Sequence, residues 1–489
     1  MIGRLLRQSG VYTLANMALK AGGLVLLAFV LDPAYLSQAD YGRHGLLETA
    51  ASLLALVGGL GLGAGLLKLL ADGEGSRVQT TAIAASLALG AAVAALVWVG
   101  APALAAFLAD GAAGSDRMLR PVRLMGVYTG LKVLGAAPLA ALRAHERAGL
   151  YAAVLVGELA LTIGGAVWLL QQGRGLEGIW TAYAAAAAVG TVALLAATLR
   201  PARPARPELA RLVGLGAPLA LAGLAGALLN SGDQYVLKAF APAEEVGVYV
   251  LAAKFGGLIN MLFVQSFNLA FAVFGIRALA AEAVAGGAGG FHRRVLRPYI
   301  VVTAWGVLGV SLLARDVTAA LSPNPDFLRA EPLVLPISLG FLAYGVYFVM
   351  MNVLYARERT RSVAAFVLAA AALNLGLNLA AIPWLGAMGA ALATLASYAA
   401  LAAITARAAH RLAPQPYPWR AIAVAVALVV GLWGAAQLWA GPGGLGLRLA
   451  LLAGYPPLVV ACGAYRWSEL RDGVARLRSQ LRARREHGA

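Results

Sequence analysis

Three lysines lie inside long apolar stretches of this chain, where a charged side chain needs a specific reason. They are Lys20 in stretch 8–31, Lys132 in stretch 118–142 and Lys254 in stretch 245–275. A charge at the centre of a bilayer costs at least about 2.5–3.5 kcal/mol. Lys20 and Lys254 are near mid-stretch, too far from the ends for easy extension to water. Ammonium groups that meet at mid-depth would bind an anion, and the two phosphates of a lipid pyrophosphate suit such a site.

A structural role is the alternative for the same lysines. Each could pair with a carboxylate such as Glu48 or Glu158, or extend along its helix to water. The sequence leaves both readings open.

A second polar set combines one carboxylate with amide and hydroxyl oxygens. Its members are Asp233, Asn374, Asn378 and Thr394. Asn374 and Asn378 are four residues apart and therefore share one helix face. Hard oxygen ligands favour a small cation over zinc. The alternative is that these amides hydrogen-bond neighbouring helices, as Asn side chains do in membranes.

The sequence contains no pattern typical of a catalytic centre. We find no His, Cys and Glu spacing for a tightly bound metal and no phosphate-cradling glycine loop. We therefore expect no enzyme activity, no catalytic residue, no cofactor, and no metal other than a small cation at the oxygen ligands named above. Transport energy would come from a sodium or proton gradient, the membrane potential or the flux of substrate.

The elements that position these residues are membrane-spanning helices. Of the 489 residues, 61% are hydrophobic and only 12% are charged, against about 25% in soluble domains. Apolar stretches long enough to cross a bilayer recur along the chain, and they lack the alternation of barrel strands. We predict an all-α integral membrane protein with about fourteen spans. The predicted spans are 8–31, 42–67, 78–108, 118–142, 148–171, 177–199, 213–238, 245–275, 295–314, 332–355, 362–384, 386–406, 421–440 and 446–465.

Basic residues predict the orientation of these spans. With fourteen spans, 27 Lys and Arg residues fall on one side, nine on the other and three inside spans. The positive-inside rule then places both termini in the cytoplasm. This pattern accounts for the net charge of +17, and we expect no nucleic acid partner.

Two lobes are predicted on either side of a linker rich in Pro and Arg. Weak repeats agree, since Asp40–Gly42 resembles Glu245–Gly247 and Gly175–Gly178 resembles Gly386–Gly389; parallel repeats are typical of transporters. The predicted parts are a six-helix lobe at 1–199, a linker at 200–212, a second six-helix lobe at 213–412, two additional helices at 413–466 and a basic tail at 467–489. The tail either lies on the anionic inner leaflet or is solvated.

Several short segments, taken together, are typical of a known family. They are Ser37–Gly42, Gly216–Pro218, Ser231–Tyr235, Val246–Tyr249 with Lys254, Asn374–Asn378, Ile382–Pro383 and Gly386–Thr394. In order and spacing they resemble the oligosaccharide-lipid flippases of the multidrug/oligosaccharidyl-lipid/polysaccharide exporter superfamily, which are related to the lipid II flippases. The resemblance extends from about Arg7 to Leu412.

This resemblance implies two six-helix lobes around a central cavity that opens alternately to each side. The cargo would be an oligosaccharide on undecaprenyl pyrophosphate, flipped from the inner to the outer leaflet of the bacterial cytoplasmic membrane for surface or exopolysaccharide synthesis. It implies cavity cations at Lys20 and Lys254, and a sodium site at Asp233, Asn374, Asn378 and Thr394. Asn378 replaces an acidic residue of some relatives, which puts sodium coupling in doubt. Membrane lipids, a polysaccharide polymerase and export machinery are the expected partners.

Three alternatives follow from the same residues. A lipid II flippase shares the superfamily, as does a cation-coupled drug exporter, which would favour acidic and aromatic cavity residues. A polysaccharide polymerase would need a large outer loop, whereas the longest predicted outer loop, around Arg315–Glu331, is short. No local motif identifies the sugar.

Overall fold

The computed structural model describes most of the chain as helix. It describes residues 22–23, 25–109, 112–200, 202–268, 271, 291–414, 417–438 and 444–465, without the side chains of 112–113 and 291–294. Within these ranges there is no β-strand. Lys20, most of the first predicted span and the basic tail lie outside the described residues.

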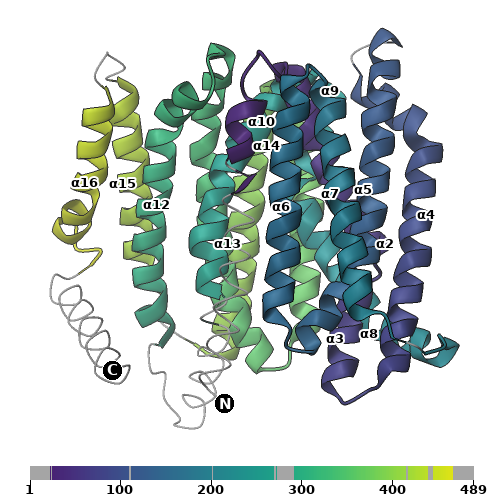
Figure 1. Cartoon of the computed structure of the whole chain (residues 1–489). Coiled ribbons are helices and arrows are strands. Elements are labelled where there is room, and N and C mark those ends of the chain that lie inside the picture. The colour runs from purple at the N-terminus through teal and green to yellow at the C-terminus, as the bar shows by residue number, and fades with distance from the viewer. Residues whose placement is uncertain are drawn as a thin grey trace, which may run out of the picture. The chain divides into compact units, whose positions relative to one another are not determined.

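The described helices follow one another along the chain (Figure 1). They are α2 Gln38–Gly58, α3 Leu62–Ala71, α4 Ser76–Leu108, α5 Ala112–Ala144, α6 Ala148–Gln171, α7 Gly175–Thr198, α8 Arg206–Ser231, α9 Asp233–Phe240, α10 Ala243–Ile259, the π-helical turn η1 Asn260–Gln265, α12 Phe291–Leu321, the 3-10 turn η2 Pro325–Ala330, α13 Glu331–Ala356, α14 Thr360–Leu412, α15 Trp419–Leu438 and α16 Gly444–Ala461.

The described helices confirm the predicted all-helical membrane class. Eleven are long and apolar enough to cross a bilayer, or twelve if α2 and α3, bent by 47°, form one span. The predicted span 148–171 coincides with α6. Predicted spans 362–384 and 386–406 together form α14, which is interrupted at Gly386. The total of fourteen spans stays a prediction.

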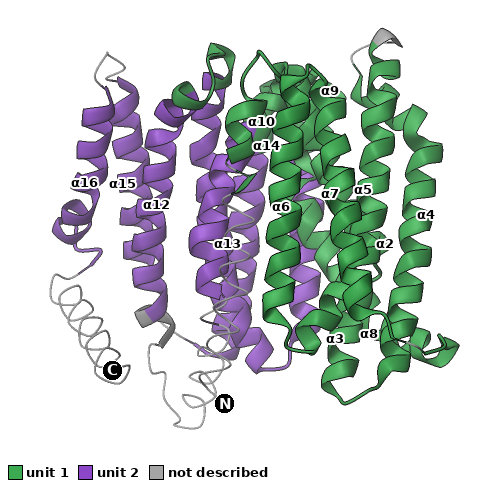
Figure 2. Ribbon diagram, viewed as in Figure 1, with its two compact units in different colours: residues 1–250, 319–327, 378–390 green, residues 251–318, 328–377, 391–489 purple. Residues whose placement is uncertain are grey.

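The chain divides into two compact units, coloured separately in Figure 2. Unit 1 comprises 1–250, 319–327 and 378–390, and unit 2 comprises 251–318, 328–377 and 391–489. The lobes predicted from the repeats are a different division of the chain and stay a prediction. The link between α7 and α8 is short, because α8 already begins at Arg206, where a proline at the next position suits a first helical turn.

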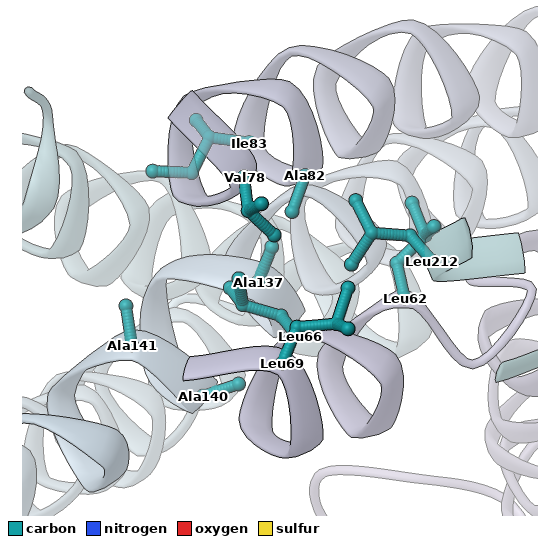
Figure 3. Close-up of a cluster of buried hydrophobic side chains, with 10 residues drawn as sticks. All are labelled: Leu62, Leu66, Leu69, Val78, Ala82, Ile83, Ala137, Ala140, Ala141 and Leu212. Carbon is teal, nitrogen blue, oxygen red and sulfur yellow. The ribbon is translucent and has the colours of Figure 1, made fainter. Parts of the chain in front are cut away.

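Leucine and alanine side chains fill the core of unit 1 where α3, α4, α5 and α8 meet (Figure 3). The members are Leu62, Leu66, Leu69, Val78, Ala82, Ile83, Ala137, Ala140, Ala141 and Leu212, each at most 4% exposed. Small residues let membrane helices approach closely enough for dispersion contacts, which drive association where the hydrophobic effect is absent. This packing fixes α5, which carries part of the candidate site.

The two repeat segments around Gly42 and Gly247 pack against each other within unit 1. A Cβ atom built on Gly42 would lie 2.2 Å from the Ala243 carbonyl oxygen, and one built on Gly247 would lie 2.6 Å from the Gln38 carbonyl oxygen. The Gln38 amide also donates to the Glu244 carbonyl at 3.3 Å. The glycines are therefore required by the backbone approach of α2 and α10.

The last two helices are fixed to the rest of unit 2 by polar contacts. Arg448 of α16 forms a 2.6 Å ion pair with Asp316 of α12, and the Trp305 indole N–H donates to the Leu452 carbonyl at 2.9 Å. Gln437 of α15 donates to Glu331 of α13 at 2.8 Å. Hence α15 and α16 are integral parts of unit 2.

Replacing Gly42 by alanine should destabilise the protein, because the added methyl group has no room between α2 and α10. We expect a loss of about 1–3 kcal/mol, as for other overpacked sites, seen as a lower melting temperature in detergent. Gly157→Ala on α6 is the matched control, since nothing lies within 4 Å of its added Cβ. Equal melting temperatures for the two variants would contradict the close approach.

Candidate binding site

Two cavities in unit 1 share part of their walls. One has a volume of about 290 Å³ and the other about 280 Å³. Both are lined by Glu48, Tyr128 and Tyr183. The first also reaches Trp180, and the second also reaches the ion pair described next. We call this pair of cavities the unit 1 pocket.

An ion pair between α5 and α6 forms one wall of the unit 1 pocket. The Lys132 ammonium lies 2.8 Å from Glu158 Oε1, with side chains 37% and 13% exposed. On α7, Gly190 makes room for this carboxylate, because a Cβ there would lie 3.1 Å from Glu158 Oε2. The charge of Lys132 is thus neutralised inside the protein, which is the structural alternative that the sequence left open.

The other wall combines a carboxylate with aromatic rings. The Tyr183 hydroxyl donates to Glu48 Oε1 at 3.4 Å, and His44 Nε2 lies 3.4 Å from the same oxygen. The Trp180 and Tyr183 ring centroids are 5.2 Å apart, and Tyr128 lies 5.6 Å from Tyr183. Such tilted and edge-on pairs stabilise one another and hold Glu48 beside a rigid apolar surface.

Helical spacing explains why these side chains converge. Tyr128 and Lys132 are four residues apart on α5, and Trp180 and Tyr183 are three apart on α7, so each pair shares a face. The contacts of α5 with α6 and α7 bring these faces to one place. Four helices, α2, α5, α6 and α7, therefore supply the polar and aromatic wall; Figure 2 shows all four within unit 1.

The unit 1 pocket suits a ligand rich in hydroxyl groups. Carboxylates accept hydrogen bonds through two oxygens each, an ammonium donates up to three, and tyrosine hydroxyls do both. Rigid aromatic faces offer apolar area for the C–H faces of a ring. A few fixed polar groups on an otherwise apolar wall are typical of small-molecule sites.

The three lysines predicted to bind a pyrophosphate differ in their surroundings in the structure. Lys132 forms the ion pair with Glu158, and Lys254 is half-buried on α10, six residues before the start of η1. Lys20 lies outside the described residues. A shared role in binding pyrophosphate stays a prediction.

The predicted cation ligands are all buried. Asp233, Asn374, Asn378 and Thr394 are 2%, 3%, 1% and 3% exposed. Asp233 begins α9 and accepts hydrogen bonds from the Gln234 N–H at 2.9 Å and from the Tyr249 hydroxyl. Asp233 and Asn378 belong to unit 1, whereas Asn374 and Thr394 belong to unit 2. Their joint coordination of a cation therefore stays a prediction.

Sequence reasoning treated Glu48 and Glu158 only as partners for lysine and missed the aromatic residues. The signal for Tyr128 with Lys132, and for Trp180 with Tyr183, was their helical spacing. Nothing local connects Glu48 to Tyr183, because these residues are 135 positions apart.

Solved structures of membrane transporters share this fold. The lipid II flippase MurJ in an inward closed conformation matches with a TM-score of 0.74 and 11% identity, covering 92% of this chain and 98% of that chain. An inward-facing multidrug resistance MATE transporter of the MOP superfamily matches with a TM-score of 0.65 and 14% identity, covering 82% of this chain and 94% of that chain. A MOP superfamily transporter from Pyrococcus furiosus matches with a TM-score of 0.51 and 14% identity, covering 84% of this chain and 94% of that chain. The fold is therefore that of the MurJ and MATE transporters.

The sequence itself places the chain in a family within this fold class. The model of the polysaccharide biosynthesis protein family matches residues 5–272, and the chain belongs to that family. Among curated proteins, no sequence matches significantly. The family and the fold confirm the resemblance on which the sequence analysis relied, and residues 5–272 include the whole unit 1 pocket.

Breaking the Lys132–Glu158 ion pair should lower stability. Lys132→Met or Glu158→Gln alone leaves one member without its partner. We expect each single variant to lower the free energy of unfolding by about 1–3 kcal/mol, which lies between the losses typical of exposed and of fully buried ion pairs. The measurement is a double-mutant cycle on thermal unfolding in detergent. A double variant that is as unstable as the sum of the single losses would show that the two side chains are not coupled.

Proposed function

We propose that the protein is a flippase that moves undecaprenyl-pyrophosphate-linked oligosaccharide from the inner to the outer leaflet of the bacterial cytoplasmic membrane by alternating access. The product would feed surface or exopolysaccharide synthesis. The observation that carries the proposal is the unit 1 pocket, a polar, aromatic-lined site within membrane helices of a polysaccharide biosynthesis family member.

For such a transporter, the sugar is harder to move across the membrane than the lipid, because the sugar is polar. Each unpaired hydroxyl in hydrocarbon costs several kcal/mol, so the glycan has to cross along protein groups or water. Glu48, Tyr183 and the ion pair offer both donors and acceptors there. The prenyl tail is apolar and remains in lipid.

The charge at the unit 1 pocket decides which part of the cargo binds there. Its walls carry two carboxylates, Glu48 and Glu158, and one ammonium, Lys132. A pyrophosphate would be repelled by this balance, whereas sugar hydroxyls would be bound. We therefore assign the glycan to the unit 1 pocket and leave the pyrophosphate to Lys20 and Lys254.

A cation-coupled drug exporter of the same superfamily is the second candidate. Glu48 beside Tyr128, Trp180 and Tyr183 would also suit a flat organic cation, because carboxylates and aromatic faces both attract positive charge. The family match favours the flippase. A lipid II flippase differs from the first proposal only in its cargo.

Deletion of the gene should cause a complete undecaprenyl-linked repeat unit to accumulate, as measured by mass spectrometry of extracted lipids. Complementation with Glu48→Gln or with Lys20→Ala/Lys254→Ala should restore transport at least tenfold less well, since a hydrogen bond to a charged group is worth about 1.5–3 kcal/mol. Glu146→Gln is the control, because this residue is not among the lining residues of the unit 1 pocket.

Two results would overturn this assignment. Unchanged lipid-linked sugars in the deletion strain, together with a gain in sensitivity to organic cations, would favour the drug exporter. Normal export by Glu48→Gln would remove the unit 1 pocket from the transport path.

Coupling to a cation is proposed for Asp233 together with Asn374, Asn378 and Thr394. Both Asp233 oxygens accept hydrogen bonds, and a carboxylate has about four acceptor sites in all. Asp233→Asn should abolish the sodium dependence of transport in reconstituted vesicles while the protein still folds. Thr394→Val should weaken the dependence, and Thr405→Val, also buried on α14, is the control. Sodium dependence that survives in Asp233→Asn would contradict the proposed cation site.

A further inference from the structure

A third cavity lies in unit 2, and none of its lining residues is among those assigned above. It has a volume of about 850 Å³ and is lined by Ala400, Ala403, Ile404, Ala406, Arg407, His410, Tyr417 and Trp419. We call it the α14 groove. These residues belong to the end of α14, except Tyr417 in the connection to α15 and Trp419, the first residue of α15.

The α14 groove changes in character along the helix. Ala400, Ala403, Arg407 and His410 follow one another at spacings of three and four, so they form one stripe on α14. The alanine part leaves an apolar channel beside Ile404, which is 42% exposed. The basic part comes at the helix end, on the side that the charge pattern predicts to be cytoplasmic.

Aromatic side chains close the end of the α14 groove. The Tyr417 hydroxyl donates to the Ala406 carbonyl at 2.7 Å, and its ring lies 5.6 Å from His410 and 5.5 Å from Trp419. Trp419 is 63% exposed. Exposed tryptophan at this level is typical of the membrane interface, where the head groups lie.

We propose that the α14 groove binds an anionic phospholipid of the bilayer. The apolar channel, the guanidinium and the interfacial aromatic residues come in the same order as the acyl chain, the phosphate and the head group. Arg407 is exposed and forms no ion pair with any carboxylate in the part of the chain that the structure describes. A guanidinium can bind a phosphate through two parallel hydrogen bonds.

The composition of the α14 groove favours a phosphodiester over the pyrophosphate of a lipid carrier. Arg407 is the one guanidinium among its lining residues, which matches a single phosphate. Lipid binding here goes beyond the proposed transport function, since none of the lining residues takes part in the unit 1 pocket or the cation set.

Native mass spectrometry of the purified, delipidated full chain tests the proposal. The probes are dioleoyl phosphatidylglycerol and dioleoyl phosphatidylcholine, which have the same acyl chains, and undecaprenyl phosphate as the carrier lipid. The wild type should retain phosphatidylglycerol preferentially, and Arg407→Gln should weaken that retention roughly fivefold, as expected for one basic residue near an anionic head group. Ala403→Trp should fill the channel and weaken both lipids, and Arg411→Gln is the matched control, because it is exposed on the same turn but does not line the α14 groove.

Several outcomes would overturn the proposal. Equal retention of the two lipids by the wild type would show that the protein does not distinguish their head groups by charge. A loss of phosphatidylglycerol retention in Arg411→Gln as large as that in Arg407→Gln would show that only the general surface charge matters. Arg407-dependent retention of undecaprenyl phosphate but not of phosphatidylglycerol would assign the α14 groove to the carrier lipid. Melting temperatures verify that each variant is folded, and Arg407→Gln alone decides the question if Ala403→Trp does not fold.

Discussion

The bilayer removes water as a hydrogen-bonding partner, and the described helices show how the chain satisfies its polar groups without it. Every backbone group at membrane depth has to be bonded within the protein. At Gly386 the backbone leaves the helical region, with φ +54° and ψ −134°, and the Glu245 carboxylate accepts the Ala387 N–H at 2.9 Å. The positive φ favours glycine at this position, and a Cβ on Gly386, 2.2 Å from Glu245 Oε1, would displace the accepting carboxylate. A break in a span is therefore accompanied by its own hydrogen-bond acceptor.

The same constraint shapes the unit 1 pocket. Lys132 and Glu158 are held as a pair because either charge alone would be costly at this depth. Glu48 is held by the Tyr183 hydroxyl, and Tyr183 is supported in turn by Trp180. The two carboxylates of the pocket thus have partners within the protein, whereas the buried Trp180 indole N–H has none in the described structure. Under the proposed function, a hydroxyl-rich ligand would exchange its own hydrogen bonds for those of the carboxylates and would accept the indole N–H.

The sequence predicted the helices well because the signal for a span is local and strong. The predicted boundaries of α6 coincide with the structure, and the interruption of α14 was expected beside Gly386. The partner of Lys132 could not be predicted from the sequence, because its pairing with Glu158 depends on the rotation of α5 and α6 about their axes. The same applies to Glu48 and Tyr183, which lie on different helices. Spacing shows which residues share a face, but only packing shows which faces meet.

Under the proposed function, the pairing of Lys132 changes how the cargo is divided between sites. A lysine neutralised by Glu158 adds little attraction for pyrophosphate, so the remaining mid-span lysines, Lys20 and Lys254, have to supply it. The unit 1 pocket, with one carboxylate in excess, then excludes the charged end of the cargo and accepts the neutral sugar. Opposite electrostatic preferences at two sites orient an amphipathic ligand, because reversing it would bring phosphate to Glu48 and sugar to the lysines. Charge placement, and not a sugar-specific motif, would therefore set the direction in which the head group enters.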